Sequence, residues 1–161
     1  MEGKIYIAIG SNLGDRQKNV RTAYRLIEKQ IGEIRSKSGL IHTKPEGFES
    51  DEEFVNGVFE LDTKLTPLDL LKALKRIESE MGRESSSKPG YSDRLIDLDI
   101  IDYKGKIISM DEMEIPHPRM HNRMFVLKPL MELDSEWVHP IYELSVLELI
   151  DRFVLNPAED F

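Results

Sequence analysis

The sequence predicts an α+β fold of the ferredoxin-like βαββαβ type: an antiparallel sheet with helices on one face, a further hairpin strand and short C-terminal helices. Three observations lead to this prediction. Apolar residues recur every three or four positions in two segments, which predicts helices. In other segments they alternate with polar residues or form short continuous runs, which predicts strands. The segments follow the order strand, helix, strand, strand, helix, strand. With 161 residues and 40% hydrophobic content, residues 1–161 are expected to form a single domain.

The first half of the pattern begins with an apolar run at residues 4–9, which predicts a buried strand. The run ends at Gly10-Ser11-Asn12, a turn signal that favours a helix-capping turn over a phosphate-binding cradle. Helical spacing of apolar residues follows from about Asp15 and stops at Gly32. Residues 34–43 are more mixed in polarity and predict a weaker strand that leads into a loop at 44–53.

The second half begins with residues 54–63, whose alternation predicts a strand with Val55 on one face and Asn56 on the other. Thr66 is expected to cap the next helix, with Pro67 at its first position, and Gly82 to end it. Residues 83–93 are rich in Ser, Gly and Pro, and their length indicates a mobile loop.

The third part is an apolar run that contains two aspartates and ends at Lys104-Gly105, which predicts a hairpin turn into residues 106–110. The remainder is expected to hold short helical segments and a last helix near 143–153. Prolines are expected to break these segments at Pro116, Pro118, Pro129 and Pro140.

Composition limits the function. The net charge of −8 argues against a general nucleic-acid binder, and no apolar run is long enough for a membrane span or a signal peptide, so we expect a cytoplasmic protein. The chain has no cysteine, which excludes disulfides and thiolate chemistry. Two basic groups nevertheless stand out, and they indicate a small anionic ligand: residues 117–131, which contain no acid, and the set Arg83, Lys88 and Arg94.

The aspartates in "RLIDLDIIDYKG" (94–105) are the strongest chemical signal. Asp97 and Asp99 are two residues apart, so a strand turns both to the same face. Two carboxylates about 5 Å apart repel by roughly 3 kcal/mol at an effective dielectric near 20. Such a pair therefore calls for a cation. That cation is either Arg94, in a structural network, or Mg²⁺, which prefers few carboxylates together with waters and phosphate oxygens.

Other motifs are weaker. The Walker-type phosphate loop is absent. His117 and His121 are four residues apart, but Pro118 between them argues against a helical zinc site. Tyr91 lies in a polar loop, where an exposed aromatic suggests stacking on a flat ligand, whereas Phe125 is expected in the core from its pattern alone.

Taken together, these residues resemble the 6-hydroxymethyl-7,8-dihydropterin pyrophosphokinase family of folate biosynthesis. The resemblance covers nearly the whole chain, and its most specific part is R-x-x-D-x-D followed by P-H-x-x-M-x-x-R-x-F. It is carried by "YIAIGSNLGD" (6–15), "FVNGVFELDT" (54–63), "RIESEMGR" (76–83), "RLIDLDI" (94–100) and "IPHPRMHNRMFVLKPLMEL" (115–133). The 83–94 loop departs from the family pattern, because Gly90-Tyr91-Ser92-Asp93-Arg94 replaces its usual Trp-Gly-Pro sequence.

The resemblance implies a magnesium-dependent transferase that moves pyrophosphate from ATP to the pterin hydroxymethyl oxygen and releases AMP. Two Mg²⁺ ions would be held by Asp97 and Asp99, and the catalytic residues would be Arg83 and Arg94. The implied ATP-binding residues are Glu78, Arg83, Arg94, Ile100, His117 and Arg123. The implied pterin-binding residues are Thr43, Glu46, Phe54, Asn56, Tyr91 and Phe125, with the ring sandwiched between the last two.

The implied partners are these two small molecules, with no nucleic acid or membrane and a monomeric chain. No general base is evident, so positioning and charge neutralisation are expected to supply most of the rate. Two alternatives stay open from the residues. One is a ferredoxin-like metabolite-binding module without catalysis, and the other is a two-metal phosphodiesterase.

Overall fold

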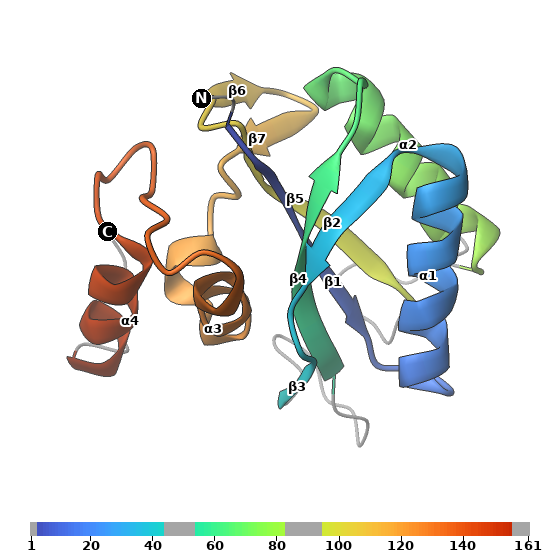
Figure 1. Ribbon diagram of the computed structural model, residues 1–161, viewed down its shortest axis with the longest axis horizontal. Helices are drawn as coiled ribbons and strands as arrows, with labels where there is room; N and C mark the ends of the chain where they lie inside the picture. The colour runs from blue at the N-terminus through green and yellow to red at the C-terminus, as the bar shows by residue number, and fades with distance from the viewer. Residues whose placement is uncertain (1–2, 44–53, 83–94, 156–161) are drawn as a thin grey trace.

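The centre of the fold is an antiparallel sheet, seen in the computed structural model, which describes residues 3–43, 54–82 and 95–155 (Figure 1). The strands run in the spatial order β2-β4-β1-β5, and β3 also pairs with β4. Their bounds are β1 (Ile5–Ser11), β2 (Glu33–Lys37), β3 (Ile41–Thr43), β4 (Phe54–Asp62) and β5 (Asp97–Tyr103). The strand that carries the two aspartates therefore pairs with the first strand. This order confirms the ferredoxin-like prediction.

Helices cover both faces of the sheet. Figure 1 shows α1 and α2 on one face and α3 and α4 on the other, with the small β6–β7 hairpin near the turn that follows β5. The helices are α1 (Arg16–Gln30), α2 (Pro67–Glu80), α3 (Met124–Leu133), α4 (Val146–Leu155) and the 3₁₀ turn η1 (Met120–Asn122). The hairpin strands are β6 (Ile108–Met110) and β7 (Met113–Ile115).

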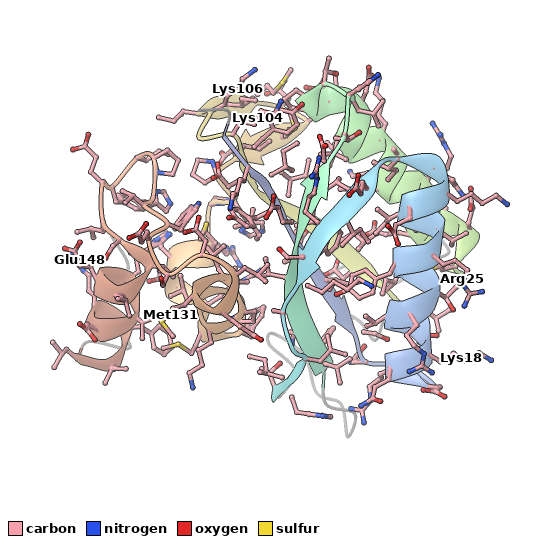
Figure 2. All side chains as sticks on the ribbon, in the orientation of Figure 1. Lys18, Arg25, Lys104, Lys106, Met131 and Glu148 are labelled. Carbon is pink, nitrogen blue, oxygen red and sulfur yellow. The ribbon has the colours of Figure 1, made fainter. Side chains whose placement is uncertain are left out.

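Local sequence explains where the two long helices begin. The Asp15 side chain accepts a hydrogen bond from the Lys18 N–H, and the Thr66 hydroxyl accepts one from the Asp69 N–H. Each cap satisfies one of the N–H groups that a helix leaves unpaired in its first turn. Lys18 and Arg25 extend from α1 away from the sheet (Figure 2).

Two apolar clusters follow from the alternation of side chains along the strands. The cluster under α1 and α2 contains Ile5, Ile7 and Ile9 of β1. The cluster under α3 and α4 contains Tyr6 of the same strand, with Ala8 packed against it. On the α3 side, the C-terminal half of β1 presents only small residues, Ala8 and Gly10.

Two strand predictions were partly wrong. The strand expected at 34–43 is divided into β2 and β3, and the ladder between them is completed by a side chain, because the Val58 N–H donates to the Ser38 hydroxyl at 2.9 Å. The turn at Lys104-Gly105 is present, with φ angles of 56° and 72°. However, the strand after it, β6, pairs with β7 and not with β5.

Two predictions about chain breaks were wrong. Gly10 and Ser11 belong to β1, and the helix-capping role falls to Asp15. Pro129 lies inside α3 instead of breaking it. A proline inside a helix costs roughly 3 kcal/mol, and here burial of Val126, Leu127 and Leu130 against the sheet opposes that cost. The last helix, expected near 143–153, covers Val146–Leu155.

None of the helices in the described part of the chain is both long and apolar enough to span a membrane.

Candidate functional site

The candidate site begins with a row of residues that crosses three strands on the α3 side of the sheet. Asp97 on β5 and Asn56 on β4 are both register partners of Gly10 on β1. In the next row on the same face, Asp99 pairs with Ala8. Partners in adjacent strands share a face of the pleated sheet. The two aspartates therefore face the same side as Asn56, with only small residues between them.

The spacing of this row suits a small ligand. Two steps across a sheet separate Asp97 from Asn56, which corresponds to about 10 Å. Both carboxylates are partly exposed, whereas Asn56 is buried at 8% relative exposure. A ligand over Gly10 would thus meet carboxylates at one end and an amide at the other.

The amide end is held by a neighbouring hydroxyl. Asn56 Nδ2 donates to Thr43 Oγ1 at 2.7 Å, across the β3–β4 pairing that also brings Thr43 opposite Phe54. The Asn56 side chain keeps a carbonyl acceptor and a second N–H, and the Thr43 hydroxyl keeps its proton. These three predicted pterin-binding residues therefore lie together. They can match a flat heterocycle whose edge alternates donors and acceptors.

The carboxylate end fits a hard divalent cation. Within the described ranges, no group of three or more His, Cys, Asp or Glu side chains is placed to hold a metal ion. Two carboxylates on one face are nevertheless the donor set that Mg²⁺ uses when waters and phosphate oxygens complete its octahedron. Asp97 and Asp99 fit that requirement because their partial exposure leaves room for such ligands.

A buried glutamate anchors the aspartate strand from behind. Glu78 of α2 is 4% exposed, and its Oε2 accepts a hydrogen bond of 2.8 Å from the Leu98 N–H. Leu98 lies between the two aspartates, and β5 is the last strand in the sheet order. This carboxylate, predicted from the resemblance to line the ATP site, thus contacts the backbone of the strand that carries the candidate metal ligands.

Ile100, also predicted to line the ATP site, turns its side chain the other way. It pairs with Ile7 and packs in the apolar cluster under α1 and α2, at 6% exposure. Its side chain therefore lies on the opposite face from Asp97 and Asp99.

The segment that follows β7 brings the predicted nucleotide-binding residues to the site face. The His117 N–H donates to the Ile101 carbonyl at 3.1 Å, which ties the segment to β5. The pKa of His117 is lowered to about 4, chiefly because burial disfavours the charged ring, with Arg123 and Arg119 adding repulsion. Its Nδ1 accepts from the Arg119 N–H at 3.1 Å. The neutral ring therefore carries its proton on Nε2, which makes it a hydrogen-bond donor toward a ligand.

Arg123 and Phe125 are in contact with each other. The guanidinium carbon lies 5.5 Å from the centroid of the Phe125 ring, within the range of a cation–π interaction. Phe125 is half-buried at the margin of the apolar cluster under α3 and α4. The segment on the α3 side of the sheet thus combines a positive charge with an aromatic ring.

Four of the predicted site residues, Glu46, Arg83, Tyr91 and Arg94, lie outside the described residues, and their roles stay predictions.

A third aspartate on β5 was missed by the sequence reading. Strict alternation would turn Asp102 away from Asp99, but an irregularity in the β1–β5 ladder places it opposite Tyr6, on the site face. Its carboxylate accepts from Trp137 Nε1 at 2.9 Å and from the Gly105 N–H at 3.1 Å. Burial raises its pKa, although these bonds oppose the shift. Asp102 is thus a structural acceptor, and nothing in the local pattern distinguishes it from the other two.

Curated proteins of similar length match the chain along most of both sequences. The 2-amino-4-hydroxy-6-hydroxymethyldihydropteridine pyrophosphokinase of Aquifex aeolicus is 35% identical over 153 residues, which cover 95% of this chain and 94% of that protein. The protein of the same name from Haemophilus influenzae is 38% identical over 159 residues, covering 94% and 98%.

Longer proteins match over a part of their length. The folic acid synthesis protein FOL1 of Dictyostelium discoideum is 40% identical over 152 residues, and the chain spans only 22% of that protein. Among solved structures, Plasmodium falciparum HPPK-DHPS superposes with a TM-score of 0.74 at 17% identity, over 97% of this chain and 45% of that one. At such identity the structural likeness supports the fold alone.

The family comparison agrees with the full-length relatives. Residues 6–135 match the family described as 7,8-dihydro-6-hydroxymethylpterin-pyrophosphokinase (HPPK). The matched range contains the aspartate pair, the Thr43–Asn56 pair and the His117–Phe125 segment. The chain therefore belongs to the 7,8-dihydro-6-hydroxymethylpterin-pyrophosphokinase family.

Proposed function

We propose that this chain transfers the terminal pyrophosphoryl group of ATP to the hydroxymethyl oxygen of 6-hydroxymethyl-7,8-dihydropterin. The acceptor oxygen attacks the β-phosphorus, the bond from that phosphorus to the α–β bridging oxygen breaks, and AMP leaves. The hydroxyl proton passes to solvent. The products are AMP and the pterin pyrophosphate, a step in folate synthesis.

The observation that carries this proposal is the row Asp97–Gly10–Asn56. It supports a phosphate-binding end and a heterocycle-binding end on one face of the sheet, about 10 Å apart. The names of the full-length relatives point to the same chemistry. Neither a simple binding module nor a phosphodiesterase requires both ends.

The proposed roles follow from chemistry. Asp97 and Asp99 would hold two Mg²⁺ ions, which when bound neutralise charge on the phosphate oxygens. His117 would donate from Nε2 to the nucleotide, and Arg123 would bind phosphate while its guanidinium rests on Phe125. Arg83 and Arg94 would offset charge that develops during transfer.

The pterin would lie with its edge on Thr43 and Asn56, with Phe54 and the backbone near Glu46 beside it. Tyr91 and Phe125 would stack on its two faces. A monomeric chain in the cytoplasm, without nucleic-acid or membrane partners, completes the proposal.

The product of the reaction tests the proposal. The protein is incubated with ATP, Mg²⁺ and 6-hydroxymethyl-7,8-dihydropterin, and nucleotides are separated by ion-exchange chromatography. AMP should appear in step with pterin pyrophosphate, and neither should form without the pterin or in excess chelator. Formation of ADP would contradict a pyrophosphoryl transfer, AMP with free pyrophosphate would indicate hydrolysis, and no product would favour a binding module.

Matched variants connect the activity to the site. Asp97→Asn should abolish product formation. Asp111→Asn makes the same change in an exposed turn between β6 and β7 and should leave the rate unchanged. Equal activity of both variants would remove Asp97 from the proposed metal site.

A further inference from the structure

We propose that Gly10 is a specificity-determining position of this site, because its missing side chain is what lets the Asn56 amide lie where it can bind the pterin edge. The inference rests on the proposed function, since the ligand is taken to be the pterin. It concerns a residue with no polar side chain, which acts through Asn56 and is therefore a positioning residue.

The contact that carries this inference is steric. A Cβ atom built on Gly10 would lie 2.8 Å from Asn56 Oδ1, closer than real Cβ contacts allow. Its next neighbours, the Val55 carbonyl oxygen at 3.5 Å and Phe54 Cδ1 at 3.7 Å, are at ordinary van der Waals distances. Of the three nearest atoms, only the Asn56 oxygen must therefore move when Gly10 becomes alanine.

Backbone conformation does not explain the glycine. The glycines with positive φ in the described part of the chain are Gly14, Gly82 and Gly105, so Gly10 has an ordinary strand conformation that alanine can adopt. The absence of a side chain at Gly10 instead leaves room for the Asn56 amide on that face of the strand.

The Asn56 side chain has little freedom to avoid that clash. It is 8% exposed, and its Nδ2 is held by Thr43 Oγ1 at 2.7 Å. One end of the amide is thus fixed by a hydrogen bond, and the other end lies over Gly10. A methyl group at position 10 must displace the amide, break the Thr43 bond, or both, and each outcome misplaces the donor and the acceptor that would bind the pterin.

The experiment measures two affinities by calorimetry, for 6-hydroxymethyl-7,8-dihydropterin and for a non-hydrolysable Mg²⁺–ATP analogue. It compares the parent with Gly10→Ala, Asn56→Ala and the double variant. Gly39→Ala is the matched control, because the nearest atoms to a Cβ there are 3.8 Å away.

The Gly10→Ala variant should bind the pterin about tenfold to a hundredfold more weakly, the loss expected from one or two misplaced hydrogen bonds. Its affinity for the ATP analogue should stay within about twofold of the parent. Its melting temperature should fall by no more than about 5 °C, because alanine's better strand propensity partly offsets the cost of displacing one hydrogen-bonded amide. In the Asn56→Ala background the same substitution should cause no further loss, because the two residues act as one unit. The Gly39→Ala control should bind both ligands like the parent.

Unchanged pterin affinity in Gly10→Ala, or a loss that adds in full to that of Asn56→Ala, would overturn the inference. A second readout needs no ligand: the Asn56 side-chain amide signals in a ¹⁵N NMR spectrum should shift in Gly10→Ala and stay in place in Gly39→Ala. Unshifted signals would also overturn it. A parent protein that binds no pterin at all would instead defeat the proposed function, and the amide shift would still report whether Gly10 positions Asn56.

Discussion

Replacing Glu78 with alanine tests how the aspartate strand is held. The substitution removes the acceptor of the 2.8 Å bond from the Leu98 N–H, and Leu98 is itself 4% exposed. A buried donor left without a partner costs about 1–3 kcal/mol, and the lost methylene adds roughly 0.8 kcal/mol. The free energy of unfolding should therefore fall by about 2–4 kcal/mol, and Tm by about 5–15 °C.

Two comparison variants sharpen the measurement. Glu78→Gln keeps an oxygen at the acceptor position and should recover most of the stability. Glu80→Ala is the matched control, because Glu80 lies on the same helix but is exposed, and it should change the stability by no more than about 0.5 kcal/mol. Thermal unfolding followed by circular dichroism, in chelator and without nucleotide, gives the three values.

The activity of the Glu78 variants should change in the same order as their stability. If Glu78 acts through the strand, Glu78→Ala should need more Mg²⁺ for half-maximal activity than the parent does, even at temperatures well below the Tm of the variant. Glu78→Gln should need about as much Mg²⁺ as the parent. A Glu78→Ala protein that melts within about 1 °C of the parent would refute the reasoning. If both variants keep the parent's Tm but lose ATP affinity equally, Glu78 contacts the nucleotide directly, as the family resemblance implies.

Four further predictions concern the site. In chelator, Asp97→Asn should be as stable as the parent or up to about 3 kcal/mol more stable, because the substitution relieves repulsion with Asp99. Chemical denaturation measures the difference. A large loss of unfolding free energy would indicate a structural ion pair instead. Arg94→Ala should lower kcat far more than it weakens ATP binding, and steady-state kinetics with an unchanged kcat would reassign it to ground-state binding. Tyr91→Ala should weaken pterin binding by roughly 1–2 kcal/mol, because the stacking contact is lost. An unchanged pterin affinity in calorimetry would contradict this prediction.

The fourth prediction concerns how the stability of the protein depends on pH through His117. The folded state holds the pKa of His117 at about 4, below its unfolded value, so only the unfolded chain gains a proton on this residue between pH 6.5 and 4. The ligand-free protein should lose stability as the pH falls through that range, and His117→Asn should lessen the loss; parallel stability curves would contradict this.

The order of the main strands and helices, the Thr66 cap of α2 and the shared face of the two aspartates could all be predicted from local sequence patterns. Thr66 caps α2 as expected, because a cap depends on residues within one turn. Asp97 and Asp99 share a face because a strand alternates every two residues. The local motifs also indicated the family, and the family match over residues 6–135 confirms this prediction.

The contacts between segments that are distant in sequence could not be predicted in this way. The row Asp97–Gly10–Asn56 depends on the register between strands that are distant in sequence, and register is set by packing across the whole sheet. The partner of Glu78 lies 20 residues away, on a different element. Gly10 read as a turn signal, and its contact with Asn56 exists only after β1 and β4 have paired. An irregularity in the β1–β5 ladder turned Asp102 onto the site face, because one extra residue reverses the alternation that local sequence predicts.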